Sequence, residues 1–197
     1  MVIASVYVDR KTATQLAIAG VKDSKTLGDT KIEVVAREIR KICQDKFVVV
    51  EVSSTEYNQL YAKLETEKQS LNNLFAGVHA QVIDELLAKV RSETAIVDKF
   101  VDETLLLEQL ENKGRELKIV QDRRAENHIA IEAASILAKD RFISNLRKIG
   151  KQYKVELPKG SAKAAITVAK QLVAAHGIEI LEEVAKLHFK TTKEVLI

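Results

Sequence analysis

The stretch ELKIVQDRRAENHIAIEAASILAKDRF, residues 116–142, decides the fold of this chain. Its first part contains the short apolar run Ile119–Val120, which is typical of a buried strand. Its second part, from Glu126 onward, predicts a long helix, and polar residues separate the two. A strand that passes through a polar turn into a helix is the unit from which α/β domains are assembled.

The same pattern repeats toward the amino terminus. Apolar runs rich in β-branched residues predict three further strands, at residues 1–9 (MVIASVYVD), 47–53 (FVVVEVS) and 94–100 (TAIVDKF). Apolar residues spaced three and four apart predict helices, the first with Asp29 or Thr30 as its N-cap and the second with Thr55. The helices are expected around residues 29–42, 55–64, 71–90, 105–110, 126–149 and 161–177. We therefore expect an α/β fold in which helices cover a central, at least partly parallel sheet.

Composition limits the class of protein. The chain has 197 residues, of which 46% are hydrophobic and 30% charged, with one Pro and seven Gly, so we expect a single globular domain spanning residues 1–197. Cys43 is the only cysteine, which excludes an internal disulfide and a thiolate zinc cluster and favours a cytoplasmic location. No apolar run approaches the roughly 18 residues that cross a bilayer, so we expect no membrane partner. The net charge of +3 permits a polyanionic partner without requiring one.

Acidic residues stand where two predicted strands end. In open α/β sheets, chemistry collects at the carboxyl ends of the strands. Asp98 ends the run AIVD, and Glu126 follows the strand that ends near Gln121. Each has an ordinary structural explanation as well: Asp98 as a turn residue, and Glu126 as a first-turn carboxylate favoured by the helix dipole. The four histidines show no metal-site spacing, and glycine-rich phosphate loops are absent.

Six motifs together carry a resemblance to a known family. They are GVKDSKTLGDTKI (20–32), YNQLY (57–61), IVDKF (96–100), RRAENHIAIEAASILAKDRF (123–142), LPKGSA (157–162) and AKLHFK (185–190). In this order they resemble the catalytic domain of ribonuclease HIII more closely than that of ribonuclease HII. The similarity extends from residue 1 to about residue 193.

The resemblance implies an RNase H fold, a five-stranded mixed sheet flanked by helices. It also implies an endoribonuclease that cleaves the RNA strand of RNA/DNA hybrids with Mg²⁺ or Mn²⁺ held by four carboxylates. Asp98 matches the third carboxylate and Glu126 the fourth, so both are expected to be catalytic and metal-binding. At an effective dielectric constant near 20, two unit charges about 4 Å apart repel each other by roughly 4 kcal/mol, and two divalent ions by about four times as much. Several carboxylates are therefore needed to neutralise the ions.

Three residues are expected to bind nucleic acid. Ser24 and Lys25 lie just before a predicted helix, where a hydroxyl, an ammonium group and free amides can hold a backbone phosphate. Arg124 stands beside the fourth carboxylate, where it can neutralise a substrate phosphate. The alternatives are an ordinary turn with a solvated Lys25, and an ion pair of Arg124 with Asp122 or Glu126.

One part of the family pattern has no match. The family has a first strand that carries an Asp-Glu pair and a glycine-rich element, in the middle of the sheet between the MVIASVYVD and AIVD strands. The small N-terminal substrate-binding domain of the family also has no counterpart. Without this strand we expect a gap or an exposed sheet edge, and weak cleavage. Three explanations compete: the sequence is a fragment, which we favour; it is a degenerate homologue; or a partner chain or rearranged segment fills the gap. The alternative function is an inert nucleic-acid-binding or purely structural RNase H-fold protein.

Overall fold

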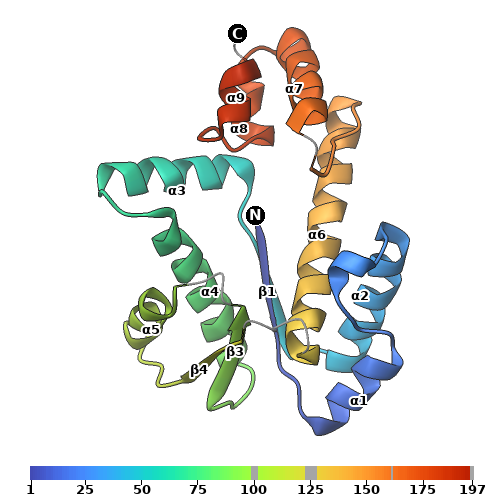
Figure 1. Cartoon of the computed structure of the whole chain (residues 1–197), viewed down its shortest axis with the longest axis vertical. Coiled ribbons are helices and arrows are strands. Elements are labelled where there is room, and N and C mark those ends of the chain that lie inside the picture. Colours follow the sequence, from blue (N-terminus) through green and yellow to red (C-terminus); the bar gives the residue numbers. More distant parts are fainter. Residues whose placement is uncertain (99–101, 123–127, 161, 196–197) are drawn as a thin grey trace. The chain divides into compact units, whose positions relative to one another are not determined.

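The computed structural model describes residues 1–98, 102–122, 128–160 and 162–195 (Figure 1). Its helices and strands fall into two compact units. The strand unit comprises Val2–Glu51 and Gln69–Arg141, and the helical unit comprises Met1, Val52–Lys68 and the chain from Phe142 onward. The expectation that residues 1–197 form one domain stays a prediction.

All four predicted strands are present in the strand unit. β1 (Val2–Val6) pairs antiparallel with β2 (Phe47–Glu51), with Val2 opposite Glu51 and Val6 opposite Phe47. β3 (Thr94–Asp98) pairs parallel with β4 (Lys118–Asp122), so that Asp98 lies beside Asp122 at the carboxyl ends. The parallel pairing expected from the alternation of strands and helices is therefore confirmed for β3 and β4.

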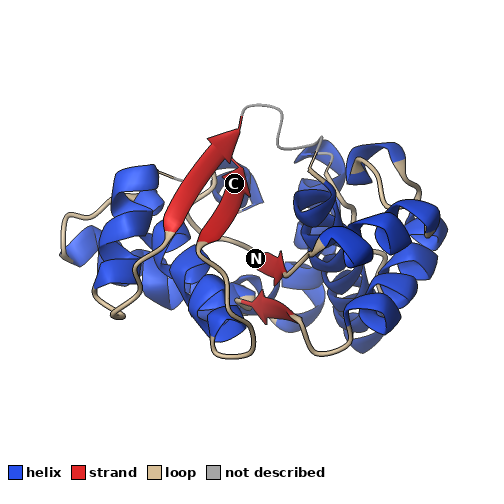
Figure 2. Cartoon of the chain, turned by 90° about the horizontal axis from the view of Figure 1, so that it is seen from below, coloured by secondary structure: helices blue, strands red, loops and turns tan. Residues whose placement is uncertain are grey.

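The two strand pairs form separate sheets, as Figure 2 shows. Within the described ranges β1 bonds only to β2, and β3 only to β4. One edge of β1 and one edge of β3 are thus without a neighbouring strand in this part of the chain. This is the position at which the sequence leads us to expect a gap.

Helices of the strand unit differ from the prediction in two details. α1 (Arg10–Ile18) was not predicted, although the Asp9 carboxylate caps it by accepting a hydrogen bond from the Thr12 amide at 2.7 Å. α2 (Asp29–Cys43) has Gly28 as its N-cap, so the prediction of Asp29 or Thr30 is wrong. Asp29 lies instead in the first turn, where the helix dipole favours a carboxylate.

An apolar cluster lies against the β3–β4 pair. It joins α4 (Leu71–Leu87) and α5 (Glu103–Glu111) to β3. Its buried members are Ala76, Ala80, Ile83, Val97, Leu106 and Leu110. Because Val97 belongs to this cluster, the strand that ends at Asp98 is supported by packing. The long predicted helix is α6 (Ile129–Tyr153), which contributes residues to both units.

The helical unit contains α3 (Ser54–Thr66), α7 (Ala162–His176), α8 (Ile180–Val184), α9 (Lys190–Val195) and the second part of α6. Its buried cluster includes Leu172, Leu181 and Val195. α3 is capped by Ser53 and not by the predicted Thr55.

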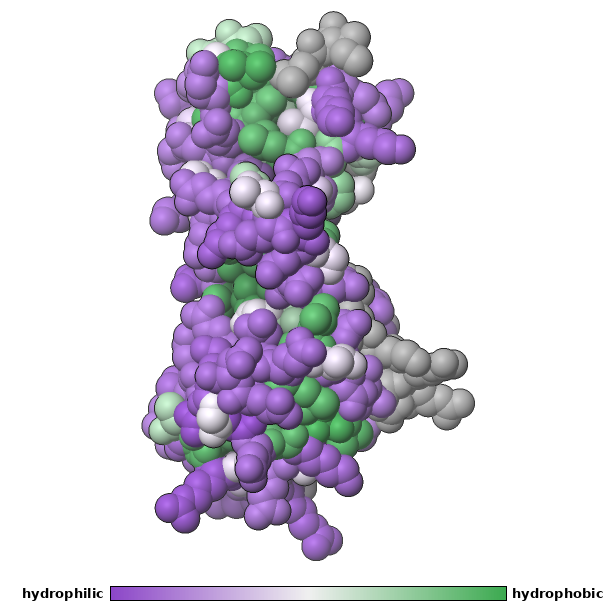
Figure 3. All heavy atoms as spheres, turned by 90° about the vertical axis from the view of Figure 1, so that its left-hand side faces the viewer, coloured by the Kyte–Doolittle hydropathy of each residue, from purple (hydrophilic) through white to green (hydrophobic). Residues whose placement is uncertain are grey.

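On the face drawn in Figure 3, hydrophilic residues cover most of the surface. None of the helices that the structure describes is long and apolar enough to cross a membrane.

Candidate functional site

Asp98 is an exposed carboxylate at the end of β3. Among the described residues, no hydrogen bond or ion pair engages its side chain. The parallel register places the end of β4 directly beside it, as Figure 1 shows. An exposed carboxylate without an ion pair, at a point where two parallel strands end together, fits a ligand for a divalent cation, since Mg²⁺ and Mn²⁺ prefer oxygen ligands.

His79 on α4 is a neighbour of Asp98 that sequence reasoning missed. Burial lowers the pKa of the His79 imidazole, while the hydrogen bond to Phe75 and the charge of Asp98 oppose this shift. The Nδ1 atom lies 2.7 Å from the Phe75 carbonyl oxygen; because a carbonyl only accepts, Nδ1–H is the donor. The sequence shows only that the four histidines lack the spacing of a metal site, and no spacing along α4 predicts that the charge of Asp98 acts on His79.

Two of the predicted site residues, Glu126 and Arg124, lie outside the described residues, which stop at Asp122 and resume at His128. In the sequence, both follow β4, the strand paired with β3. Where the structure describes the chain, no group of three His, Cys, Asp or Glu side chains is arranged to hold a metal. Asp98 is therefore the one predicted metal ligand that can be placed, and the role of Glu126 stays a prediction.

The predicted phosphate-binding residues form a short 3-10 turn, η1 (Ser24–Thr26), at the end of a loop in the strand unit. The Asp23 carboxylate caps this turn by accepting the Lys25 amide at 2.9 Å. The Thr26 and Leu27 amides donate to the Asp23 and Ser24 carbonyls. Lys25 is exposed, and within the described chain its ammonium group and the Ser24 hydroxyl have no partner.

The backbone amides of this turn are not free, so that part of the prediction is wrong. The Ser24 amide donates to Glu132 Oε2 at 3.0 Å. The Lys139 ammonium donates to the Ser24 carbonyl at 2.7 Å and to the Leu27 carbonyl at 3.3 Å. Both side chains come from α6, more than a hundred residues away in sequence. A hydroxyl and an ammonium group remain for a ligand, and the amides hold the turn in place.

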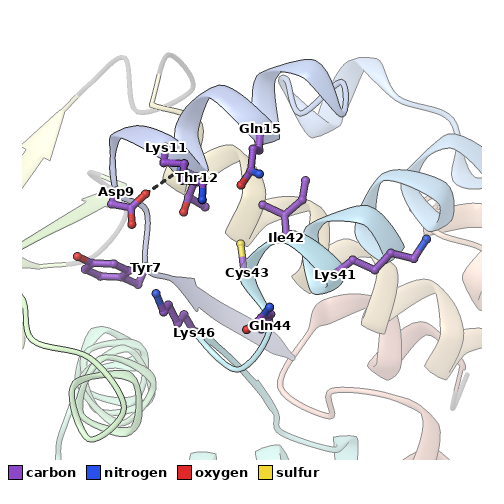
Figure 4. Close-up of a pocket in the computed structure, with 10 residues that line it drawn as sticks. All are labelled: Tyr7, Asp9, Lys11, Thr12, Gln15, Lys41, Ile42, Cys43, Gln44 and Lys46. Carbon is purple, nitrogen blue, oxygen red and sulfur yellow. Dashed lines mark hydrogen bonds between the residues drawn. The ribbon is translucent and has the colours of Figure 1, made fainter.

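A pocket of about 460 Å³ lies where β1 leads into α1 (Figure 4). It is lined by Tyr7, Asp9, Lys11, Thr12, Gln15, Lys41, Ile42, Cys43, Gln44 and Lys46. Burial raises the pKa of the Cys43 thiol to about 11, so this cysteine is protonated and unreactive at neutral pH. The lysines that line it are exposed, and none of the predicted site residues belongs to this pocket.

In the helical unit, Tyr57 and Asn58 make packing contacts. Asn58 Nδ2 donates to the Ala185 carbonyl at 2.9 Å, and its Oδ1 accepts the Leu187 amide at 3.0 Å. Tyr57 is buried, with the Lys186 ammonium 4.1 Å from its ring centroid. These residues join α3 to the segment between α8 and α9, which accounts for the YNQLY and AKLHFK motifs by packing.

Comparisons with known proteins agree with the fold and the motifs. The sequence model of the family described as Ribonuclease HII matches residues 1–192. A protein named Ribonuclease HIII from Protochlamydia amoebophila is 37% identical over 194 residues, covering 98% of this chain and 62% of the relative. Another Ribonuclease HIII, from Chlamydia pneumoniae, is 38% identical over 177 residues, covering 89% of this chain and 57% of the relative.

A solved structure gives the same result. The crystal structure of Bst-RNase HIII in complex with Mn²⁺ superimposes with a TM-score of 0.87 at 28% identity, covering 99% of this chain and 63% of that chain. This likeness confirms the predicted fold. The chain spans less than two thirds of the length of each of these three relatives.

Proposed function

Because the chain belongs to the ribonuclease HII family, we propose that it contributes the third and fourth carboxylates of a site that cleaves the RNA strand of RNA/DNA hybrids. The observation that carries this proposal is Asp98: an exposed carboxylate at the joint carboxyl end of two parallel strands, which has no hydrogen bond or ion pair to any residue that the structure describes. Family membership and the match to ribonuclease HIII sequences support the reaction class.

Asp98 and Glu126 are the residues that would hold Mg²⁺ or Mn²⁺. When bound, such ions activate a water molecule and stabilise the leaving oxygen of a phosphodiester. The Asp98 carboxylate supplies ligand oxygens from a strand supported by the apolar cluster. The Asp98 charge also favours a proton on His79, so a cation bound at Asp98 would weaken this effect.

Recognition of the hybrid is assigned to Ser24, Lys25 and Arg124. Lys25 is exposed and carries a positive charge beside the Ser24 hydroxyl, so the pair suits a phosphate group of the nucleic-acid backbone. Contacts of this kind read the shape and charge of a hybrid and not its base sequence. Arg124 is proposed to neutralise a phosphate near the metal ions.

We further propose that the residues of this chain cleave weakly without an additional strand. Two divalent ions carry four positive charges, and Asp98 with Glu126 supplies two negative ones. β1 and β3 each have an edge without a strand partner among the described residues, and the family places a strand there. A strand from a partner chain that pairs with these edges would complete the sheet and bring the other two carboxylates.

Cleavage and metal binding test this proposal separately. A labelled RNA/DNA hybrid incubated with the chain and Mg²⁺ or Mn²⁺ should be cleaved slowly or not at all, and turnover at an ordinary nuclease rate would refute the incomplete site. Mn²⁺ binding, followed by electron paramagnetic resonance, should weaken by at least about tenfold in Asp98→Asn. The matched control is Asp45→Asn, an exposed turn residue whose loss should change nothing.

An inert binding module is the second candidate. The charge of the predicted metal ligands favours it, since Asp98 and Glu126 supply two negative charges for the four positive charges of two divalent ions. Hybrid binding that weakens with salt but is the same in wild type and Asp98→Asn, with no Mn²⁺ binding in either, would support it. No hybrid binding at low salt would indicate a purely structural protein.

A further inference from the structure

Two charged side chains of α6 hold the backbone of one residue, Ser24. Glu132 accepts the Ser24 amide at 3.0 Å, and Lys139 donates to the Ser24 carbonyl at 2.7 Å. Both polar backbone atoms of Ser24 are therefore bound by the same helix. Hydrogen bonds that involve a charged group are stronger than neutral ones, so the position of Ser24 is closely tied to α6.

The burial of Glu132 shows that this arrangement is specific. The residue is only 5% exposed, although a carboxylate is costly to bury unless hydrogen bonds compensate. Glu132 and Lys139 are seven residues apart, two helical turns, so both lie on the same side of α6. The buried residue Ile136 lies between them on this helix. The helix thus presents one acceptor and one donor at the spacing that the turn requires.

The hydrogen bonds leave two polar side chains of the turn available. Within the described residues, the Ser24 hydroxyl and the Lys25 ammonium have no partner, and Lys25 is exposed. A turn whose backbone is fixed and whose charged side chain is unpaired is prepared to bind an anion without further ordering of the chain. In the sequence, α6 begins three residues after Glu126, so the same helix follows the predicted metal ligand.

We propose that Glu132 and Lys139 are positioning residues, which hold the Ser24–Lys25 turn in the conformation that binds a backbone phosphate of the hybrid. This inference rests on the proposed function, since it assigns how that site fixes its substrate. Neither residue touches the phosphate; they act through the turn. α6 thereby connects the turn that contains Lys25 to the segment of the sequence that contains Glu126, the predicted fourth carboxylate.

Salt-dependent binding of a labelled RNA/DNA hybrid to the full chain tests the proposal without any cleavage. Lys139→Met should weaken binding by about tenfold, and so should Lys25→Ala. Each variant should lower the slope of log Kd against log salt concentration by about 1, the value expected for the loss of one phosphate contact. The double variant that combines Lys139→Met with Lys25→Ala should also lose only about one phosphate contact, and it should bind the hybrid no more weakly than Lys25→Ala alone. Lys148→Met, an exposed lysine elsewhere on α6, should bind as wild type does.

A second readout measures the turn itself. In Lys139→Met and Glu132→Ala, the amides of residues 24–27 should exchange with solvent at least about tenfold faster, while the amides of α6 itself should exchange as in the wild type. Glu132→Gln keeps an acceptor oxygen and should restore most of the protection.

The outcomes separate the two proposals. Wild-type binding by Lys139→Met, unchanged exchange at residues 24–27, or loss of two contacts in the double variant would overturn the positioning role while leaving the function intact. Absence of hybrid binding by the wild-type chain would overturn the proposed function, and the positioning role with it.

Discussion

The turn at Ser24 and the strand end at Asp98 belong to the same unit, but they are held in place by different forces. The turn is fixed by polar contacts: its amides donate to Asp23, Glu132 and neighbouring carbonyls, and Lys139 binds its carbonyls. The strand end is fixed by apolar packing beneath Val97, and the Asp98 carboxylate has no hydrogen bond to another described residue. The part expected to recognise substrate is thus ordered by directional contacts, and the part expected to bind a cation by burial.

Removing the packing under the strand end should have the largest effect. Leu106 is 0% exposed and belongs to the cluster that includes Val97. Leu106→Ala should lower the free energy of unfolding by about 2–5 kcal/mol, because it removes buried surface and leaves a cavity. Urea denaturation measures this loss. Ile18→Ala, at a side chain 83% exposed, is the control and should change stability little, and an equal loss in both variants would contradict the difference in burial.

Removing the cap of the turn should have a smaller effect. Asp23→Ala deprives the Lys25 amide of its acceptor, so we expect a loss of about 0.5–2 kcal/mol in unfolding free energy. Urea denaturation against Asp45→Ala provides the matched comparison. The affinity of Asp23→Ala for the hybrid should fall by about as much as that of Lys25→Ala. Full stability in Asp23→Ala would show that the contacts with α6 are enough to hold the turn.

An ion pair between α2 and α6 should contribute less again. Arg40 and Asp140 are 2.7 Å apart, with side chains 40% and 16% exposed. Since the pair is partly solvated, a double-mutant cycle with Arg40→Met and Asp140→Asn should give a coupling of about 0.2–1 kcal/mol that shrinks as salt rises. A coupling unaffected by salt would mean that the pair is more buried than its exposure indicates.

His79 should produce the smallest change, a difference in pH dependence. The pKa of its imidazole is lowered in the folded chain, chiefly by burial, so the unfolded chain binds more protons below about pH 6.5. The free energy of unfolding should therefore fall as the pH drops from about 6.5 toward the lower pKa of His79 in the folded chain. In His79→Gln this loss should be smaller, as unfolding by urea at pH 7.5 and pH 5.5 would show. An unchanged pH dependence would place His79 in solvent.

Local patterns were enough to place the strands. Each overlaps its predicted segment, and only β4 extends past it, by the single residue Asp122, because short β-branched runs bounded by polar residues indicate burial. α1 was missed because its nine residues bury only Leu16 and so give a weak apolar pattern, although Asp9 was a readable cap. The N-cap of α2 was mistaken because Asp29 suits either a cap or a first turn, and only the backbone at Gly28 distinguishes them.

The site was predicted less completely than the fold. The structure places Asp98 at the end of β3, as the sequence predicts, while its role as a metal ligand stays a prediction. Glu132 and Lys139 were missed, since each reads as an ordinary charged residue on a helix, and their partners lie more than a hundred residues away. The closeness of His79 to Asp98 depends on how α4 crosses β3, which local spacing does not encode. Long-range polar contacts are the part of this site that local sequence patterns do not predict.

Within the described residues one edge of β1 pairs with no strand, and this has a consequence for handling the protein. Its residues are Val, Ile, Ala and Ser, without a lysine or proline to discourage another chain from adding to the strand. Concentrated solutions should therefore form higher-molecular-weight species that dilution or mild denaturant disperses, and sedimentation would reveal them. A lysine substituted at Ile3 would act as a gatekeeper and extend the concentration range in which the chain stays monodisperse.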